Sequence, residues 1–403
     1  MNNVVVIGAG QAGQALVTKL RDLSFDGQIT LIGEEPVPPY QRPPLSKKYL
    51  LGEMDRERLF LRPESFYGDH DISLRLGQSV ESIDRTAKTI KVGSDVVPYG
   101  QLALTTGSVP RSLPSAIGGD LGGVFVVRSL RDIDSMQPAM VKGAKALIIG
   151  GGYIGLEAAA VAAGLGLSVT VVEMADRILQ RVAAPETSDV IRAAHVAHGV
   201  VLREGVGLSH LIGETHVRGA ILTDGTELAC DFVIVGVGIT PNTKLAQDAG
   251  LVIDNGIRTN AFGQTSDPDI WSAGDCASFP YRGTRIRLES VGNAIDQAEL
   301  VAANMVGEPQ AYLAKPWFWS DQYDLKLQIA GLNTGYDHVV TRPGEVAGSV
   351  SIWYYQGQTL LAVDAINDPR AYMVGKRLIE AGKSPAPDVV ADAKTALKDL
   401  LKG

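Results

Sequence analysis

Short apolar runs that end in glycine alternate with stretches of helical periodicity along much of the chain. Residues 4–7 are four apolar residues of the type found in buried strands, and Gly8, Gly10 and Gly13 follow them at once. This pattern predicts a strand that turns sharply into a helix. It is typical of turns that hold a pyrophosphate on the backbone N–H groups of a helix N-terminus. Alone, it also fits an ordinary glycine-rich turn.

The same pattern returns later in the chain. Residues 146–149 run into Gly150, Gly152 and Gly155, and an alanine-rich helical stretch follows at residues 156–163. Two independent copies argue against a chance match of either one. The sequence therefore predicts two dinucleotide sites.

An acidic residue ends the second apolar strand of each copy. Residues 28–33 lead to Glu34, with Glu35 as a neighbouring rival, and residues 168–173 end in Glu173. A carboxylate at this point accepts hydrogen bonds from ribose hydroxyls and repels a 2′-phosphate, so Glu173 favours NAD(H) over NADP(H). Arg177 lies within one helical turn of Glu173 and is able to offset its charge, which leaves the strictness of that preference open.

Other segments predict the remaining organisation. Prolines in residues 38–47 predict a stiff loop before a helix that Ser46 caps. Alternating runs in residues 72–111 predict a small sheet inserted in the first unit; they lie at 73–76, 79–83, 89–92 and 101–105. The second unit has further strands at 202–204, 219–222 and 232–237. Residues 267–275 return to the first unit and place Asp275 at the carboxyl end of a strand.

The C-terminal part changes in character. An aromatic segment at residues 317–323 precedes alternating runs at 326–329, 348–354 and 360–365, and a helix is predicted over residues 368–381. Together the patterns predict an α/β protein with two Rossmann-like dinucleotide-binding domains and a C-terminal α+β domain. The predicted boundaries are 1–112 with 251–320, then 113–250, then 321–403. The third domain is interpreted as an aromatic lid, or else as a plain packing or dimerisation module.

Composition excludes several function classes. The net charge of −8 argues against general nucleic-acid binding and adhesion to an anionic membrane. No stretch has the roughly 18 apolar residues of a membrane span, and the first strand begins too early for a secretory leader. We therefore expect a cytoplasmic protein. Cys230 and Cys276 form no C-x-x-C pair, so neither a disulfide framework nor a cysteine metal site is expected, and no metal is predicted.

Three motifs carry a family resemblance across essentially the whole chain. They are YQRPPLSK at residues 40–47, TSDPDIWSAGD at 265–275 and PWFWSD at 316–321. With the two glycine patterns, they resemble the pyridine-nucleotide flavoprotein reductases built like glutathione reductase. Within that group they are most similar to the bacterial FAD-dependent NADH:ferredoxin reductases of the putidaredoxin reductase and ring-hydroxylating dioxygenase reductase type.

The resemblance implies FAD in the first site and NADH in the second. The implied FAD contacts are Gly8, Gly10, Gly13, Glu34, Arg42, Lys47, Val80 through its backbone, Arg128, Asp275 at a ribityl hydroxyl, and Trp319. The glycine pattern and the resemblance together give the NADH contacts as Gly150, Gly152, Tyr153, Ile154, Gly155, Glu173 and Gly238, with Glu289 at the nicotinamide.

The resemblance also implies catalytic roles. Lys47 and Glu157 resemble an ion pair beside the flavin ring, and Trp319 resembles the aromatic side chain over the isoalloxazine, with Trp317 as the alternative. For Glu157, a first-turn glutamate favoured by the helix dipole is the competing interpretation.

The implied function is electron transfer from NADH through FAD to a [2Fe–2S] ferredoxin that supplies a monooxygenase or dioxygenase. No cysteine lies in the 40–47 loop, so a one-electron carrier is expected in place of thiol chemistry. The predicted dock for an acidic ferredoxin is Arg282, Arg285 and Arg287, with Lys326 and Arg377 as more distant candidates, and the chain is expected to be a monomer or weak homodimer. The alternatives are a monodehydroascorbate-reductase-like enzyme with a small acceptor and a flavoprotein like apoptosis-inducing factor with a binding role.

Overall fold

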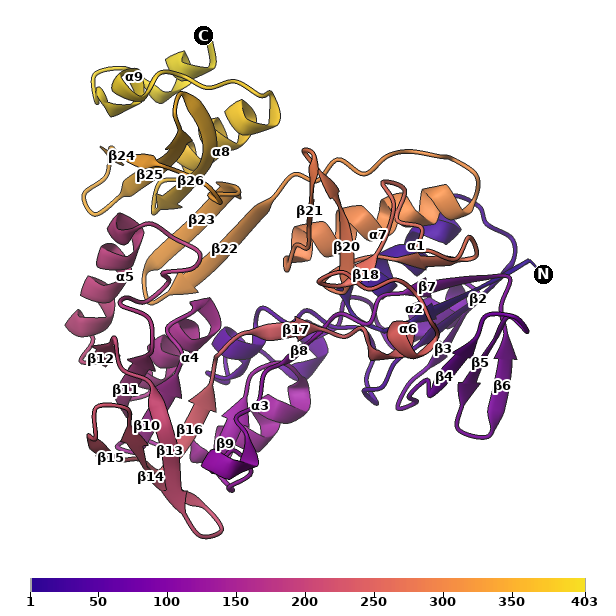
Figure 1. Cartoon of the computed structure of the whole chain (residues 1–403), viewed down its shortest axis with the longest axis horizontal. Helices are drawn as coiled ribbons and strands as arrows, with labels where there is room; N and C mark the ends of the chain where they lie inside the picture. Colours follow the sequence, from indigo (N-terminus) through magenta and orange to yellow (C-terminus); the bar gives the residue numbers. More distant parts are fainter. Residues whose placement is uncertain (1, 403) are drawn as a thin grey trace. The chain divides into compact units, whose positions relative to one another are not determined.

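The computed structural model describes residues 2–402 and divides the chain into two compact units (Figure 1). The first unit comprises residues 1–42, 54–109 and 239–315. The second comprises residues 43–53, 110–238 and 316–403. Each unit is built around its own glycine turn.

A five-stranded parallel sheet forms the centre of the first unit. Its strand order is β19-β7-β1-β2-β3. The strands are β1 (Asn3–Ile7), β2 (Gln28–Ile32), β3 (Ile72–Arg75), β7 (Gln101–Leu104) and β19 (Ile270–Ser272). Helices α1 (Gln11–Asp22) and α7 (Val291–Met305) cover one face, where Val4 and Leu31 pack against Leu16 and Val301.

A small antiparallel sheet covers the other face. It consists of β4 (Ser82–Asp84), β5 (Thr89–Val92) and β6 (Asp95–Pro98), and its Ile83 and Ile90 pack against Leu102 and Ile270 of the parallel sheet. The predicted inserted sheet was therefore too wide. The runs predicted at 73–76 and 101–105 pair with the parallel sheet: β7 is buried between two layers, and β3 is an edge strand of the same sheet.

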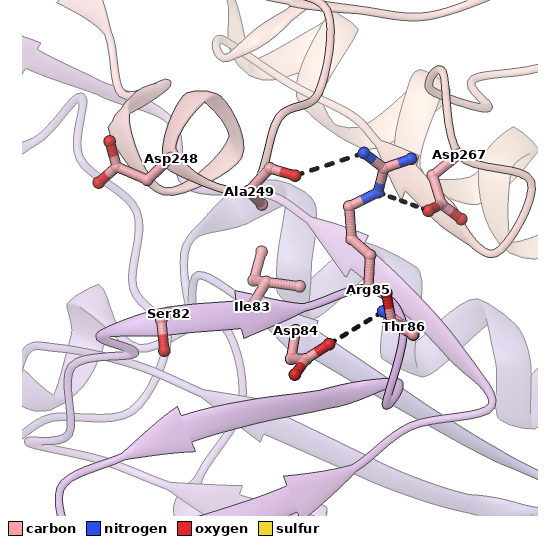
Figure 2. A pocket seen from close by; sticks show the side chains of 8 residues that line it. All are labelled: Ser82, Ile83, Asp84, Arg85, Thr86, Asp248, Ala249 and Asp267. Carbon is pink, nitrogen blue, oxygen red and sulfur yellow. Dashed lines mark hydrogen bonds and ion pairs between the residues drawn. The ribbon is translucent and has the colours of Figure 1, made fainter.

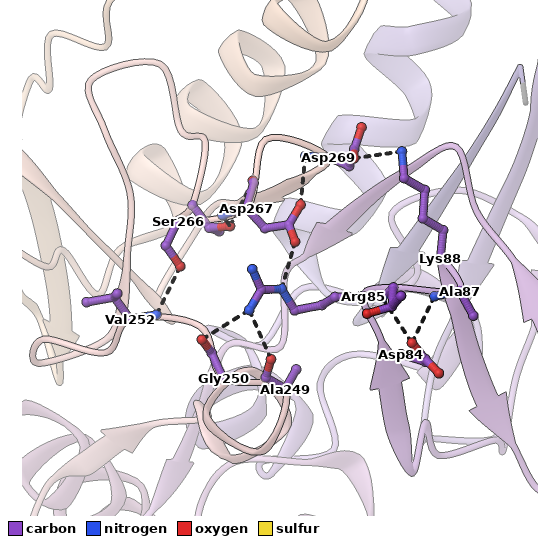
Figure 3. Close-up of polar contacts among 12 residues, drawn as sticks. Asp84, Arg85, Ala87, Lys88, Ala249, Gly250, Val252, Ser266, Asp267 and Asp269 are labelled. Carbon is purple, nitrogen blue, oxygen red and sulfur yellow. Dashed lines mark hydrogen bonds and ion pairs between the residues drawn. The ribbon is translucent and has the colours of Figure 1, made fainter.

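A guanidinium fixes the loop that leads into β19. Arg85 Nε donates to Asp267 Oδ2 (2.7 Å), and its Nη1 donates to the carbonyls of Ala249 and Gly250 just after α6 (Lys244–Asp248). Figure 3 shows these contacts, together with the ion pair between Lys88 and Asp269. They fix the start of the segment that carries Asp275.

A shallow pocket opens beside the same guanidinium (Figure 2). Its lining is mainly polar, from β4, the turn after it, α6 and Asp267. Because Arg85 already donates to three acceptors and the other charged lining groups are carboxylates, this pocket offers no obvious anion or dinucleotide site.

The shorter elements of the first unit complete its surface. They are η2 (Arg56–Leu59), α2 (Glu64–Asp69), β8 (Ser108–Pro110), β17 (Ile239–Pro241), β18 (Ile257–Arg258), β20 (Ala277–Tyr281) and β21 (Thr284–Ile286). β8 pairs with β17, and β18, β20 and β21 form a small sheet of their own.

The second unit repeats the parallel architecture. Its sheet has the order β12-β11-β10-β16-β9. The strands are β9 (Val124–Val126), β10 (Lys145–Ile149), β11 (Ser168–Glu173), β12 (Val201–Glu204) and β16 (Phe232–Val235). A three-stranded antiparallel sheet packs on one side through Leu211 and Leu222; its strands are β13 (Leu208–Gly213), β14 (Val217–Leu222) and β15 (Glu227–Ala229). The helices are α3 (Leu130–Met136), α4 (Tyr153–Gly164) and α5 (Pro185–Ala197).

An antiparallel sheet with helices on one face forms the C-terminal part of this unit. Its order is β22-β23-β26-β25-β24, and α8 (Pro369–Glu380) packs on it through Leu378 against Trp353 and Val363. The strands are β22 (Trp317–Gln322), β23 (Leu325–Gly331), β24 (His338–Pro343), β25 (Val350–Gln356) and β26 (Thr359–Ile366), followed by α9 (Pro387–Ala391) after α8. β24 was not predicted from the sequence.

These findings confirm the predicted α/β class with two Rossmann-like sheets and a C-terminal α+β part. The helix predicted at 368–381 is α8, which the Asp368 carboxylate caps by accepting from the Ala371 N–H. The predicted domain boundaries stay a prediction, and the one at residue 320 falls inside β22. Within residues 2–402, no helix is both long enough and apolar enough to cross a membrane.

One buried carboxyl group lies between the C-terminal sheet and the start of α5. Asp364 of β26 is 1% exposed and accepts from the hydroxyls of Tyr354 and Thr187. Its Oδ1 has no hydrogen-bond partner within residues 2–402. Burial raises the pKa of Asp364 to about 6, although the two hydroxyls oppose that rise.

Candidate functional site

The first glycine turn, residues 8–13, divides its glycines between packing and an open surface. Gly8 has φ +114°, and a Cβ there would lie 2.2 Å from the Thr105 carbonyl oxygen. A Cβ on Gly13 would lie 2.0 Å from the Gly8 oxygen, whereas one on Gly10 would meet nothing within 4 Å. Only Gly10 therefore faces free space at the start of α1, where a ligand can approach the backbone.

The second glycine turn, residues 150–155, repeats this division. A Cβ on Gly150 would lie 2.5 Å from the Gly236 oxygen, and one on Gly155 would lie 2.2 Å from the Gly150 oxygen. Gly152 has no atom within 4 Å of its Cβ position. Neither α1 nor α4 has a side-chain cap or an acid in its first turn, so both helix starts present backbone N–H groups suited to an anion.

This division predicts different effects for two glycine substitutions. With FAD in the first site, as the resemblance implies, Gly10→Ala will weaken FAD binding by at least about tenfold, because the new methyl group occupies the approach to the pyrophosphate. Gly13→Ala will reduce folded yield, because its Cβ collides with backbone. The measurements are FAD content per chain and the melting temperature of the FAD-stripped protein. Gly152→Ala is the matched control, with unchanged FAD content and weaker NADH binding; a Gly10→Ala protein that keeps full FAD affinity would contradict the assignment.

Asp275 lies beside the start of α1. The chain approaches that helix at Gly274, which has φ +82° and whose Cβ would lie 3.0 Å from the Ala12 Cβ. Ser108 Oγ donates to Asp275 Oδ2 (2.9 Å), and Arg287 Nη1 donates to the Asp275 carbonyl (3.1 Å). The carboxylate is thus held next to the first glycine turn, as a ribityl contact requires.

The acids after β2 have different surroundings. Glu35 accepts from Arg42 Nη2 (2.7 Å) and from the Tyr40 hydroxyl (2.7 Å), whereas Glu34 is exposed. This supports Glu34 over its rival as the ribose acceptor. Arg42, predicted to contact FAD, has Glu35 as its ion-pair partner here.

The acid after β11 has its carboxylate fixed by backbone. Glu173 accepts from the N–H groups of Gly151 (2.7 Å) and Ala175 (2.8 Å). Arg177 turns away to donate to Ser188 Oγ (2.6 Å) and the Ala183 carbonyl (2.8 Å). The Arg177 guanidinium, whose position left the preference for NAD(H) over NADP(H) open, is thus hydrogen-bonded within the protein.

The structure brings Lys47 and Glu157 together. Lys47 Nζ lies 3.1 Å from Glu157 Oε1, and Asp321 lies on its other side at 3.6 Å. Ser46 Oγ donates to Glu157 Oε2 (3.0 Å), and Ser320 Oγ donates to Oε1 (2.7 Å). The prediction that Ser46 caps a helix was wrong: residues 45–49 form a single π-helical turn, and the hydroxyl is used on Glu157.

The helix-dipole interpretation of Glu157 does not hold. The residue lies beyond the first turn of α4, which contains no acid, and it is 6% exposed. Burial raises the pKa of Glu157, while Lys47 and the two serine hydroxyls act in the opposite direction. The carboxylate is thus held in the interior by specific partners.

The two tryptophans of β22 stack on each other on one face of the strand. Their ring centroids are 5.3 Å apart with an interplanar angle of 20°. Lys47 Nζ lies 5.9 Å from the Trp319 ring, whereas Lys376 lies beside Trp317 at 5.6 Å. The contact with Lys47 favours Trp319 as the aromatic group nearer the ion pair.

The remaining predicted contacts lie as follows. Val80 is half-buried against the core, and the Arg128 backbone N–H donates to Asp132. The ring centroids of Tyr153 and Phe318 are 5.0 Å apart. Ile154 is 41% exposed. Gly238 has φ +100°. Glu289 forms an ion pair with Arg287 (2.5 Å) and stays partly exposed.

The predicted dock is less basic than its sequence indicates. Arg285 donates to the carbonyls of Thr259 and Ser278 and pairs with Asp254, and Arg287 pairs with Glu289. Arg282 is exposed and lies over the Tyr281 ring at 5.2 Å. Of the three guanidiniums, only that of Arg282 faces solvent.

Neither thiol has the surroundings of a reactive cysteine. Cys230 and Cys276 are free and buried, and burial together with Asp231 raises the pKa of the Cys230 thiol to about 11. In the described part of the chain, no group of three or more His, Cys, Asp or Glu side chains is placed to hold a metal.

Sequence reasoning missed three buried polar residues that connect to Glu157, and it assigned Ser46 a different role. Ser320, Gln322 and His195 are each 2% exposed or less. The alternation of β22 was the available signal, since Ser320 and Gln322 share the face opposite the tryptophans. Nothing in the sequence pointed to His195, which comes from α5.

Comparison with known proteins agrees with this geometry. The family described as "Pyridine nucleotide-disulphide oxidoreductase" matches residues 2–298, and "Reductase C-terminal" matches residues 317–401. Rhodocoxin reductase of Rhodococcus erythropolis is 40% identical over 400 residues, covering 98% of this chain and 93% of that protein.

Two solved structures superpose over nearly the full length. The ferredoxin reductase for the CYP199A2 system of Rhodopseudomonas palustris is 40% identical with a TM-score of 0.95, covering 99% of each chain. The reductase in the covalent putidaredoxin reductase–putidaredoxin complex is 37% identical with a TM-score of 0.95, covering 99% of this chain and 98% of that one. The chain belongs to the pyridine nucleotide-disulphide oxidoreductase family, and within it to the bacterial FAD-dependent ferredoxin reductases that supply electrons to oxygenase systems.

Proposed function

We propose that this chain transfers two electrons from NADH, through FAD, to two molecules of a [2Fe–2S] ferredoxin that serves a monooxygenase or dioxygenase. One proton is released for each NADH oxidised. The observation that carries the proposal is the pair of glycine turns, each with one glycine facing open space at an uncapped helix start.

The residues of the first unit fit FAD. Gly10 leaves room for the pyrophosphate, Glu34 is exposed for the adenosine ribose, and Asp275 is held beside the same turn. When bound, FAD accepts a hydride and passes its electrons on singly, which neither a protein side chain nor NADH does. Arg42, Val80 and Arg128 are proposed as further FAD contacts.

The residues of the second glycine turn fit NADH better than NADPH. Gly152 leaves the approach open, and the Glu173 carboxylate lies at the end of β11 with Arg177 bonded elsewhere. A 2′-phosphate would meet that carboxylate without a guanidinium to balance its charge. Tyr153, Ile154, Gly238 and Glu289 complete the proposed NADH contacts. The cytoplasm, which supplies NADH, is the proposed location.

The state of the two cysteines supports a one-electron acceptor. Two-electron transfer through a dithiol needs a reactive, paired cysteine, and the two cysteines here are buried and unpaired. A related reductase is found in a covalent complex with putidaredoxin, which supports a ferredoxin as the partner. A steady-state assay that compares a [2Fe–2S] ferredoxin with monodehydroascorbate and ferricyanide tests this, and a preference for a small acceptor would overturn it.

Arg282 is the proposed contact for an acidic ferredoxin. Ferredoxin reduction will slow on the order of tenfold as salt is raised from low to high concentration, while flavin reduction by NADH will change little. Arg282→Ala will lower the ferredoxin rate at low salt and flatten its salt dependence. Arg370→Ala, at another exposed guanidinium, is the control and will leave both unchanged. Equal salt dependence of the two half-reactions would remove the dock.

A further inference from the structure

A continuous set of buried polar side chains leads away from the Lys47–Glu157 pair. Ser320 Oγ contacts Glu157 Oε1 at 2.7 Å, and Gln322 Nε2 contacts Ser320 Oγ at 3.1 Å. Gln322 Oε1 lies 2.8 Å from His195 Nε2. The Tyr323 hydroxyl lies 3.0 Å from His195 Nδ1 and ends the set.

This polar chain (Tyr323, His195, Gln322, Ser320 and Glu157) is buried for most of its length. His195 is 0% exposed, Ser320 1% and Gln322 2%. Such groups are retained in an interior only when their hydrogen-bonding capacity is used, since an unpaired buried polar atom costs about 1–3 kcal/mol. The extent of this polar chain therefore needs an explanation other than packing.

Every hydrogen bond in the polar chain points the same way. The ionised Glu157 only accepts, so Ser320 must donate to it and must accept from the Gln322 amide nitrogen. That orientation turns the Gln322 oxygen toward His195, whose Nε2 must carry a proton. Burial lowers the pKa of His195 and keeps the ring neutral, so Nδ1 accepts from Tyr323.

We propose that His195 and Gln322 are positioning residues for the flavin chemistry: through Ser320 they hold Glu157 ionised, and thereby fix the charge and place of Lys47. This deepens the proposed function and rests on the assignment of Lys47 to the flavin. In this role His195 and Gln322 stabilise the negative charge on Glu157. The amide of Gln322 does not pass protons readily, so the polar chain orients dipoles toward Glu157 without serving as a proton path.

The charged and titratable groups around the polar chain are few. Glu157 faces Lys47, and Asp321 lies on the far side of that ammonium group. His195 faces Tyr323 and the exposed His198, whose ring stacks on Tyr323 at 3.7 Å. Glu157 is thus the only carboxylate of the polar chain, and its protonation leaves Lys47 with the partly exposed Asp321, 3.6 Å away, as its remaining counter-charge.

The test is the midpoint potential of bound FAD as a function of pH. Where Glu157 gains its proton, Lys47 loses the nearer of its two counter-charges and favours the reduced flavin more strongly, so the potential rises more steeply toward low pH. Gln322→Met removes the donor to the Ser320 hydroxyl and will move this break upward by up to about one pH unit, as expected for the loss of a neutral hydrogen bond that supports the Ser320–Glu157 bond. His195→Leu will move it in the same direction.

Three further variants separate positioning from packing. His195→Gln keeps a donor for Gln322 and will restore most of the wild-type profile. His198→Leu, which removes a histidine outside the polar chain, will leave the profile unchanged, and Ser320→Ala will give the largest shift. If His195→Leu and Gln322→Met both keep the wild-type break, the inference is wrong. If one of these two variants fails to bind FAD, the other decides, and His195→Gln and His198→Leu remain its controls.

The outcome is distinguishable from failure of the proposed function. The potential is measured on the FAD-loaded protein with dyes and needs no ferredoxin. A shifted break in a protein that reduces no ferredoxin would leave the positioning role in place and overturn the acceptor. An unchanged break in the variants of a protein that reduces ferredoxin well would overturn the positioning role and leave the ferredoxin as acceptor.

Discussion

Replacing Lys47 with methionine will slow the reduction of bound FAD by NADH by about 10²-fold and make its midpoint potential more negative. The ammonium group is the one cation within 4 Å of Glu157 among residues 2–402, and fixed charges of this kind account for losses of that size when they are removed from other active sites. Anaerobic stopped-flow absorbance and a dye-coupled redox titration measure the two effects.

The neighbouring lysine supplies the control. Lys48 is exposed and belongs to the same π-helical turn, so Lys48→Met removes an equal charge from nearly the same place in the sequence. Its flavin reduction rate will stay within about twofold of wild type. If Lys47→Met leaves both the rate and the potential unchanged, Lys47 has no role at the flavin.

Asp364→Asn will stabilise the folded protein above pH 7, where the aspartate is ionised without a cation. The pKa of Asp364 is raised to about 6 in the folded state, so between its ordinary value and pH 6 the folded state binds more protons than the unfolded one. The wild-type protein therefore loses stability as pH rises through this range. Two pKa units correspond to about 3 kcal/mol.

The measurement is the thermal midpoint of wild type and variant from pH 4 to pH 8. The advantage of Asp364→Asn will be largest at pH 7 and above and will vanish near pH 4, where both side chains are neutral. Asp324→Asn, at an exposed aspartate on the same sheet domain, will show no such dependence. A gap that is constant with pH would mean that Asp364 is not the titrating group.

The fold and both glycine turns were predictable because their signals are local. An apolar strand, a glycine spacing and an acid at the next strand end all lie within about thirty residues, and each reports on backbone geometry that the ligand requires. The C-terminal alternation gave three strands of five for the same reason. β24 (His338–Pro343) was missed because it contains Arg342 and Pro343 and shows no clear alternation of apolar and polar residues.

The parts that the sequence missed depend on contacts between distant segments. Burial of both faces decided that residues 101–104 join the parallel sheet, and only folding brings Arg85 to Asp267. The dock stays a prediction, and charge counts alone could not show that the Arg285 guanidinium is hydrogen-bonded to two backbone carbonyls. His195 could not be predicted because its hydrogen-bond partners, Gln322 and Tyr323, lie more than a hundred residues away in the sequence.

The two faces of β22 give the strand two independent uses. Trp317 and Trp319 occupy one face, and Ser320 and Gln322 occupy the other. Substitutions at Ser320 and Gln322 should therefore change the midpoint potential of bound FAD while the tryptophan face of the strand stays unchanged. A graded series of reductases, matched to ferredoxins of different potential, is then accessible by altering one edge strand at alternate residues.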